Sequence, residues 1–337
     1  MPGVPDAPAS HAATVPSIKD GWFSEDEVMW PGQRMSLKVE KVLYQGRSAY
    51  QDVLVFQSTN YGRVLVLDGV IQVTERDEMA YQEMIAHIPL FAHPNPSSVL
   101  IVGGGDGGVL REVCRHACVR DITMCEIDQK VVEVSKRFLS DVTASSFSDS
   151  RLTLLFEDAA QFVKRHPNSY DVIVVDSSDP VGPAEALFTS DFYAELRKSL
   201  KPSGIICNQG ECQWLHLDLI GKVLGDCGKT FATVDYAFTT IPTYPCGQIG
   251  FLLCSLSDAP NMLREPRRAI DPQMQAALRY YSPEVHRAAF VLPRFAERIV
   301  GPLRKNRGTL LPRDSIAYCA VAAASAACAY LLARRAS

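Results

Sequence analysis

The sequence predicts an α/β protein in two parts, a small N-terminal antiparallel β-domain followed by a doubly wound sheet with helices on both faces. Three observations support this fold class. Before residue 77, β-rich runs follow one another with tight turns between them. From Ser98 onward, short apolar runs alternate with segments of helical periodicity. The first of these runs, Val99–Val102, leads through a glycine-rich turn into a helix, which is typical of sheets that bind nucleotides or nucleosides.

The antiparallel domain is predicted from the pattern over residues 35–74. Short runs of valine, leucine and phenylalanine alternate there with turn formers, including Asn60 and Gly62 in the segment 57–63. Asp68-Gly69 makes a further tight turn. The strands predicted here are Val53–Phe56, Val64–Leu67 and Val70–Thr74.

A helix is predicted over Glu78–Ile88, because Met79, Met84, Ile85 and Ile88 recur at helical spacing. Prolines follow this segment, and proline lacks the N–H that a helix interior needs. We therefore expect them to link the helix to the next domain; they are Pro89, Pro94 and Pro96.

The second domain is predicted from seven apolar runs and the helical segments between them. No repeat of fixed period is present. The predicted strands are Val99–Val102, Asp121–Ile127, Leu152–Phe156, Val172–Val175, Ile205–Cys207, Phe231–Phe238 and Ile249–Cys254. The predicted helices are Leu110–His116, Gln129–Phe138, Ala160–Arg165, Ser190–Leu200 and Leu215–Cys227.

Composition limits the class of protein. The 337 residues carry a formal net charge of −4, so no basic excess suggests nucleic acid as a partner. Ten cysteines at irregular spacings, several inside apolar runs, are typical of a reduced, cytoplasmic protein. Cys114, His116 and Cys118 could suggest a metal site. Because no second Cys/His pair follows at ligand spacing, we favour a helix there and expect no metal.

The two ends of the chain differ in character. Residues 1–17 are rich in proline and alanine and are expected to be disordered. Ile316–Ala333 are 18 uncharged residues between basic ones, which is the lower limit for a membrane span; nine are alanine, so insertion would be marginal. A tail anchor and a helical or disordered appendage both stay open. The expected divisions are 1–17 (tail), 18–76 (β-domain), 77–300 (Rossmann-like domain) and 301–337 (basic and apolar tail).

Acidic residues follow the strand Val172–Val175. Ligands of parallel sheets collect at the carboxyl ends of the strands, where Asp176 is expected, with Asp179 close behind it. Pro180, Gly182 and Pro183 then form a loop that we expect to act as a lid. The blander interpretation is a turn in which the aspartates bond their own backbone. The pattern indicates a pocket for a cation.

The glycine turn distinguishes between two ligand classes. Gly103-x-Gly105-x-x-Gly108 matches the dinucleotide fingerprint, and Glu126 after the next strand is placed to bind ribose hydroxyls. Asp106 inside the turn would repel a pyrophosphate but would attract a sulfonium, although it could also be a solvated turn residue. Asp158, at a third strand end, suits an adenine amino group. The charges favour an S-adenosyl ligand.

With these residues in view, the chain resembles the spermidine synthases, a family of polyamine aminopropyltransferases. The resemblance extends from about Gly21 to Pro293. It implies a methyltransferase-like Rossmann domain behind a small β-domain, a homodimer or homotetramer, decarboxylated S-adenosylmethionine as donor and putrescine as acceptor. The matching segments are 21–23, 30–32, 67–72, 81–83, 103–113, 126–128, 176–183, 209–211, 242–245 and 286–293.

The resemblance also implies roles for single residues. Asp176 would be the catalytic acid/base residue. Donor-binding residues would be Gln51, Gln82, Gly103, Gly105, Asp106, Glu126, Asp158 and Ala159. Diamine-binding residues would be Tyr81, Asp176, Asp179 and Tyr244, with Gln72 and Glu211 lining the channel. One departure is visible, because the family more often has Gly-Asp-Gly where this chain has Glu157-Asp158-Ala159.

Other functions remain open from the sequence. A putrescine N-methyltransferase shares the fold and most of the motifs, but its donor carries a carboxylate that Asp106 would repel. Spermine or thermospermine synthesis differs in acceptor length alone. A catalytically silent scaffold that senses polyamines belongs to another class. Tyr81 could also be a core aromatic on an amphipathic helix, and Gln82 a solvated helix residue.

Overall fold

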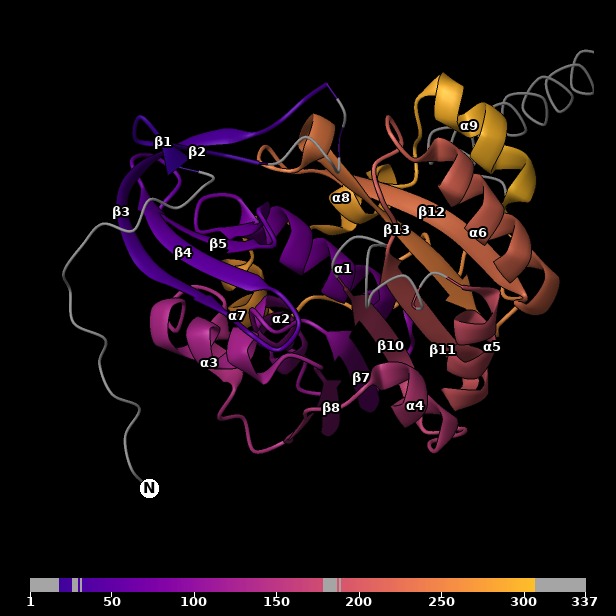
Figure 1. Ribbon diagram of the computed structural model, residues 1–337. Helices are drawn as coiled ribbons and strands as arrows, with labels where there is room; N and C mark the ends of the chain where they lie inside the picture. Colours follow the sequence, from indigo (N-terminus) through magenta and orange to yellow (C-terminus); the bar gives the residue numbers. More distant parts are fainter. Residues whose placement is uncertain (1–17, 26–29, 31, 178–186, 188, 307–337) are drawn as a thin grey trace, which may run out of the picture.

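The structure is a computed structural model that describes residues 18–25, 30, 32–177, 187 and 189–306. It contains two sheets joined by a long helix (Figure 1). The tails predicted over 1–17 and over 307–337, with the candidate anchor, lie outside the described residues, as do Asp179 and the proline loop behind it.

The N-terminal sheet is antiparallel throughout the described residues, with strands in sequence order. The three strands predicted from the sequence are present. On one face, Val55 and Leu65 pack against Val134 of the following domain. The strands are β1 (Ile18–Lys19), β2 (Trp22–Ser24), β3 (Ser36–Arg47), β4 (Asp52–Ser58), β5 (Arg63–Leu67) and β6 (Val70–Thr74).

The second sheet has the order β12-β13-β11-β10-β7-β8-β9. Pairing is parallel from β9 to β11, whereas β13 is antiparallel to β11 and to β12. The order reverses between β7 and β10, which creates a crevice at their carboxyl ends. The strands are β7 (Ser98–Gly103), β8 (Asp121–Cys125), β9 (Leu152–Leu155), β10 (Tyr170–Asp176), β11 (Leu200–Gln209), β12 (Thr233–Thr240) and β13 (Gln248–Ser255).

Helices cover both faces of this sheet, as predicted. Successive residues of β10 face opposite cores: Val174 packs with α1 and α2, and Ile173 packs with α4, α5 and α6. The helices are α1 (Glu78–Ala92), α2 (Gly108–Cys114), α3 (Gln129–Phe138), α4 (Ala159–Lys164), α5 (Ser190–Ser199), α6 (Leu217–Thr230), α7 (Pro272–Ala277), α8 (Pro283–Ala288) and α9 (Arg294–Val300).

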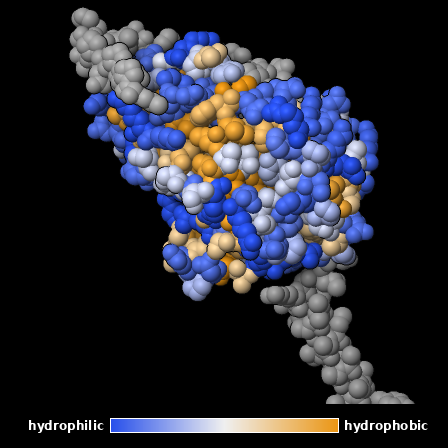
Figure 2. All heavy atoms as spheres, turned by 90° about the horizontal axis from the view of Figure 1, so that it is seen from below, coloured by the Kyte–Doolittle hydropathy of each residue, from blue (hydrophilic) through white to orange (hydrophobic). Residues whose placement is uncertain are grey.

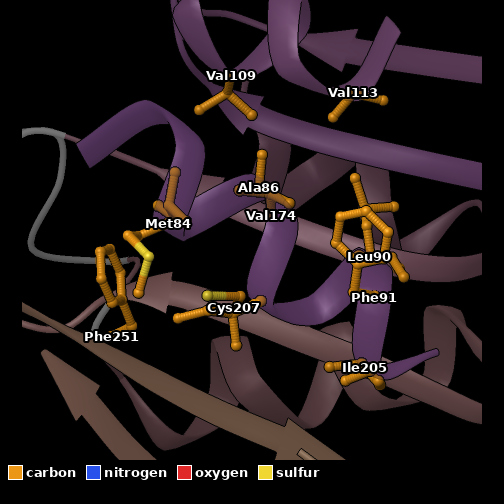
Figure 3. Packing of buried hydrophobic residues seen from close by; sticks show 14 of the residues in the cluster. Met84, Ala86, Leu90, Phe91, Val109, Val113, Val174, Ile205, Cys207 and Phe251 are labelled. Atoms are coloured by element: carbon orange, nitrogen blue, oxygen red, sulfur yellow. The ribbon is translucent and has the colours of Figure 1, made fainter. Parts of the chain in front are cut away.

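Helix α1 lies between the N-terminal strands and the large sheet (Figure 1). It corrects one expectation, because Pro89 lies inside the helix instead of ending it. Proline in a helix interior costs about 3 kcal/mol. The residues around it are completely buried, including Ile88 and Leu90, so packing outweighs that cost. Figure 3 shows this core, with Met84 of α1 beside Phe251 of β13.

The surface seen from below is mostly hydrophilic, with hydrophobic residues gathered mainly in one band (Figure 2). Across the part of the chain that the structure describes, no helix combines the length and the apolar character needed to cross a bilayer. The candidate anchor at Ile316–Ala333 falls outside that part of the chain.

Candidate functional site

A single cleft at the carboxyl ends of β7, β8 and β10 collects the residues predicted for the site. The N-terminal strands supply its opposite wall. Asp179 is the exception, because it lies outside the described residues. The predicted residues that line the cleft are Gln51, Gln72, Tyr81, Gln82, Gly103, Gly105, Asp106, Glu126, Asp158, Ala159, Asp176, Glu211 and Tyr244.

The glycine turn brings β7 close to the end of β10. Gly103 has φ +78°, a backbone conformation that side chains disfavour. A Cβ on Gly103 would lie 2.2 Å from the backbone oxygen of Asp176, and the N–H of Gly104 donates to that same oxygen at 3.0 Å. The turn therefore needs glycine in order to place Asp176 at the cleft.

Asp106 is held inside the turn. One of its carboxylate oxygens accepts from the N–H of Gly108 at 2.8 Å and from Nε2 of Gln82 at 3.0 Å. Gln82 is 2% exposed, so the interpretation as a solvated helix residue is wrong. Its Oε1 is buried and has no partner among the described residues. Asp106 therefore belongs to the turn and lines the cleft, but it is not the exposed, solvated turn residue of the alternative interpretation.

Glu126 and Gln51 meet through a residue that the sequence prediction did not use. The N–H of Asp128 donates to Glu126 at 2.8 Å, and Gln51 Nε2 donates to the Asp128 carboxylate at 2.9 Å. Asp128 also caps α3 by accepting from the N–H of Lys130. It therefore ties the β-domain to the end of β8. Its position before a helix was a recognisable N-cap signal.

Asp158 and Ala159 begin α4 at the outer end of the cleft. Asp158 is exposed, and its carboxylate accepts from the N–H of Ala160 at 2.8 Å as the helix N-cap. Ala159 is buried. The side chain of Asp158 thus has a structural role of its own, beside any contact with a ligand.

Asp176 is the last residue of β10, and it contacts helix α1 in the cleft. Its Oδ1 accepts from the hydroxyl of Tyr81 on α1 at 2.6 Å, and its Oδ2 is buried with no partner among the described residues. The ring of Tyr81 packs against the rings of Tyr244 (5.7 Å) and Phe251 (5.9 Å). Tyr244 in turn donates to the backbone oxygen of Gln72 at 2.7 Å. The carboxylate of Asp176 thus accepts a hydrogen bond from a tyrosine far away in the sequence. The alternative interpretation, a turn in which the aspartate bonds its own backbone, does not predict this contact.

Glu211 marks the other end of the cleft. It is 2% exposed and has φ +61°, a left-handed backbone conformation. Its Oε2 lies 2.6 Å from Nδ1 of His216, which also lines the cleft, and its Oε1 is buried without a partner among the described residues. His216 was missed by sequence reasoning, because nothing in the pattern shows which way a residue just before a helix points.

Burial gives the acids unusual titration behaviour. Burial raises the pKa of Glu126 to about 7. The pKa of Asp176 is raised by burial and then by the neighbouring Asp106 charge, while burial also raises the pKa of Asp106. Burial and the charge of Asp176 raise the pKa of Tyr81, so its hydroxyl stays protonated. A positively charged ligand would relieve this repulsion.

The described lining of the cleft contains one basic residue, His216. Among its described lining residues there is no lysine or arginine, and Asp68 and Glu157 add to the acids already named. Nor do three His, Cys, Asp or Glu residues come together anywhere in the described chain in a way that could hold a metal ion. Apart from His216 beside Glu211, the acids therefore have no basic counterpart among the described lining residues.

Fold and site together define a nucleoside-binding enzyme of the methyltransferase fold whose cleft suits cationic ligands. Two family descriptions match the chain: a spermine/spermidine synthase domain over residues 78–264 and a spermidine synthase tetramerisation domain over residues 21–75. The chain belongs to the spermidine synthase family, whose members are aminopropyltransferases.

Relatives match over nearly the whole chain. A spermidine synthase of Coffea arabica is 52% identical over 85% of this chain and 92% of its own length. A spermidine synthase of Dictyostelium discoideum is 52% identical over 83% of this chain and 98% of its own length. One of Schizosaccharomyces pombe is 52% identical over 85% of this chain and 95% of its own length.

Solved structures agree with the fold. A spermidine synthase in complex with the transition-state analogue AdoDATO superposes with a TM-score of 0.77 at 33% identity, covering 85% of this chain and 97% of that one. The spermidine synthase of Thermotoga maritima superposes with a TM-score of 0.75 at 33% identity, covering 83% of this chain and 94% of that one. The predicted fold class is therefore confirmed.

Proposed function

We propose that this chain transfers the aminopropyl group of decarboxylated S-adenosylmethionine to putrescine, giving spermidine and 5′-methylthioadenosine. The observation that carries the proposal is the cleft itself, in which buried acids gather with no lysine or arginine among the described lining residues. A phosphorylated cofactor would be repelled there, whereas a sulfonium and a diamine are both attracted. Family membership supports the same reaction.

We assign the donor to the half of the cleft beside the glycine turn. Glu126 would accept from the ribose hydroxyls, and Asp106 would face the positive part of the donor, oriented by Gln82. Gly103 and Gly105 allow the backbone to approach the ligand closely. Gln51, Asp158 and Ala159 would complete the site at its outer end.

We assign the diamine to the half of the cleft between β10 and β13. Asp176 and Tyr81 would hold the reacting amine, with Tyr244 packed beside them. Glu211 would bind the distant ammonium, and Gln72 would line the channel between the two ends. Asp179, which lies outside the described residues, stays a predicted ligand of the diamine.

In the reaction, the amine nitrogen forms a bond to the carbon beside sulfur, and the C–S electron pair leaves with the sulfur as a neutral thioether. The leaving group needs no proton, so the protein must supply an uncharged amine, alignment and exclusion of water. An alkyl ammonium titrates near 10, as lysine does. A neighbouring sulfonium lowers that pKa, and the free Oδ2 of Asp176 would accept the proton as the N–C bond forms.

We also propose the domain divisions 18–76 and 77–300, and assembly into a homotetramer through the β-domain, in line with the tetramerisation domain matched over residues 21–75. Membrane contact through the C-terminal tail stays a prediction. Fractionation of cells that express the chain with and without residues 314–337 tests it, and identical behaviour of the two forms would end the idea.

The reaction is tested by product analysis. The purified chain is incubated with putrescine and either decarboxylated S-adenosylmethionine or S-adenosylmethionine, and the products are identified by mass. We expect spermidine and methylthioadenosine from the decarboxylated donor. N-methylputrescine from the intact donor would establish the methyltransferase instead, and absence of any product would support the silent scaffold. Replacing putrescine by spermidine tests acceptor length, and efficient spermine formation would contradict the choice of acceptor.

A further inference from the structure

Two cysteines from distant parts of the chain meet beside the acceptor end of the cleft. Cys212 follows Glu211 directly and lines the cleft, while Cys246 lies two residues after Tyr244. The two thiols lie close enough for Cys246 to raise the pKa of Cys212, and both are free cysteines. Neither has a part in the reaction described above.

Backbone pairing fixes this meeting. The N–H of Gly210 donates to the oxygen of Gly250, and the N–H of Gly250 donates to the oxygen of Glu211, both at 2.8 Å. Beyond them, Nε2 of Gln213 donates to Oε1 of Gln248 at 2.5 Å. The segment that carries Cys212 is thus held antiparallel to the segment that follows Cys246.

The two thiols differ in access and environment. Cys212 is 2% exposed, and its pKa is raised to about 11 by burial and by its interaction with Cys246. Cys246 is exposed and has φ +56° within the turn Pro245–Gly247, which non-glycine residues rarely adopt. Its sulfur lies 3.6 Å from the side-chain amide of Gln33. Cys246 is therefore the thiol that a solvent-borne oxidant reaches first.

We propose that Cys212 and Cys246 form a reversible disulfide that switches the acceptor end of the cleft in response to a peroxide. The Cys246 thiolate attacks one oxygen of hydrogen peroxide, which gives a sulfenic acid and, with a proton, one water. The sulfur of Cys212 then attacks the sulfenic sulfur, and the oxygen leaves with the thiol proton as a second water. Two thiols lose two electrons and two protons, and the peroxide gains both.

The bond changes the acceptor site through its neighbours. An S–S bond of about 2.05 Å is much shorter than the distance between two sulfurs that are not bonded, so the two segments must approach each other. Glu211 is adjacent to one cysteine, and Tyr244, which packs on Tyr81, is two residues from the other. A displacement of about 1 Å at such positions can cost up to about a hundredfold in turnover. This consequence rests on the proposed function, whereas the bond itself does not.

The chain contains an internal comparison. Cys227 of α6 and Cys254 of β13 belong to the same hydrophobic core cluster, and both are buried. The same molecule therefore contains a second pair of neighbouring cysteines, of which neither is exposed to solvent. If exposure of one partner controls the reaction, peroxide oxidises Cys212–Cys246 and leaves Cys227–Cys254 reduced.

The test uses the full-length protein, reduced, freed of reductant and exposed to hydrogen peroxide. Remaining thiols are blocked with N-ethylmaleimide, and disulfide-linked peptides are mapped by mass spectrometry without reduction. Each of the two tryptic peptides carries a second cysteine, so fragment ions and the variants Cys246→Ser and Cys212→Ser assign the bond. We expect a Cys212–Cys246 link that dithiothreitol reverses and that neither variant forms. Its absence in the wild-type protein, or a Cys227–Cys254 link formed first, overturns the proposal.

Turnover is measured on the same samples. We expect oxidation to lower kcat/KM for putrescine about tenfold or more, dithiothreitol to restore it, and Cys246→Ser to keep its activity in peroxide. An equal loss in Cys246→Ser, or full activity of the linked protein, overturns the switch. A reduced protein that makes no spermidine but forms the link refutes the proposed function alone.

Discussion

Tyr81 on α1 donates a hydrogen bond of 2.6 Å to Asp176 at the end of β10, and this contact holds one oxygen of the aspartate while the other is buried with no partner among the described residues. The two residues are 95 positions apart in sequence. The contact orients a buried carboxylate that has no basic partner among the cleft's described lining residues.

Replacing Asp176 by Asn removes the proton acceptor but keeps a side chain that Tyr81 can bond. We expect turnover to fall by about 10²–10⁴-fold, which is the usual contribution of a general base, while donor affinity persists. Single-turnover kinetics and donor titration measure the two effects. Tyr81→Phe is the matched control and should lose less. Near-normal turnover in Asp176→Asn would remove this residue from the mechanism.

The same substitution should stabilise the empty protein at high pH. The folded-state pKa of Asp176 is raised by burial and by Asp106, so its favourable contribution is present below the ordinary aspartate pKa and is lost as pH rises through the raised value. We expect the Tm of Asp176→Asn to exceed that of wild type by at least about 3 °C at pH 9. At pH 4 the difference should largely vanish. A pH-independent difference would mean that Asp176 titrates normally.

Gly103→Ala tests the glycine turn. The added Cβ would lie 2.2 Å from the backbone oxygen of Asp176, at a φ of +78°. We therefore expect the free energy of unfolding to fall by about 2 kcal/mol or more, and the activity to be lost as well. Gly228→Ala in α6 is the control, because nothing lies within 4 Å of its Cβ. That change should raise stability by about 0.5–1 kcal/mol. Chemical denaturation measures both, and a neutral Gly103→Ala would contradict the close approach.

His216 positions Glu211, to which its Nδ1 lies at 2.6 Å. We expect His216→Ala to raise KM for putrescine about tenfold with little change in kcat, because the side chain acts on binding of the distant ammonium. His216→Gln can still donate to the carboxylate and should restore most of the affinity. Equal effects of both variants on kcat would indicate a general structural defect instead.

The sequence located the acids of the cleft because one rule places them. Asp106, Glu126 and Asp176 each follow a parallel strand, and parallel strands end at one edge of a sheet. No such rule gives the direction of the strands β12 and β13 at the edge of the sheet. Nor does it give the hydrogen-bond partners of the side chains. The hydrogen bonds that Gln51 donates to Asp128 and that Tyr81 donates to Asp176 join residues far apart in sequence. The predicted end of the helix before Pro89 was wrong, because the packing around Pro89 and not its low helix propensity decides where α1 ends.

The central claim is that buried acids hold positively charged substrates, and proton release on donor binding tests it most directly. Burial raises the pKa of Glu126 to about 7 and raises those of Asp106 and Asp176, so the empty cleft retains protons near neutral pH. Decarboxylated S-adenosylmethionine favours the ionised acids and must expel those protons.

Calorimetry at pH 6.5, in buffers of different ionisation enthalpy, counts the protons released. We predict a release of about one proton or more for the donor, fewer for the neutral product methylthioadenosine, and a donor affinity that rises between pH 5 and pH 8. Donor binding without proton release, with the same affinity across that range, would contradict the account.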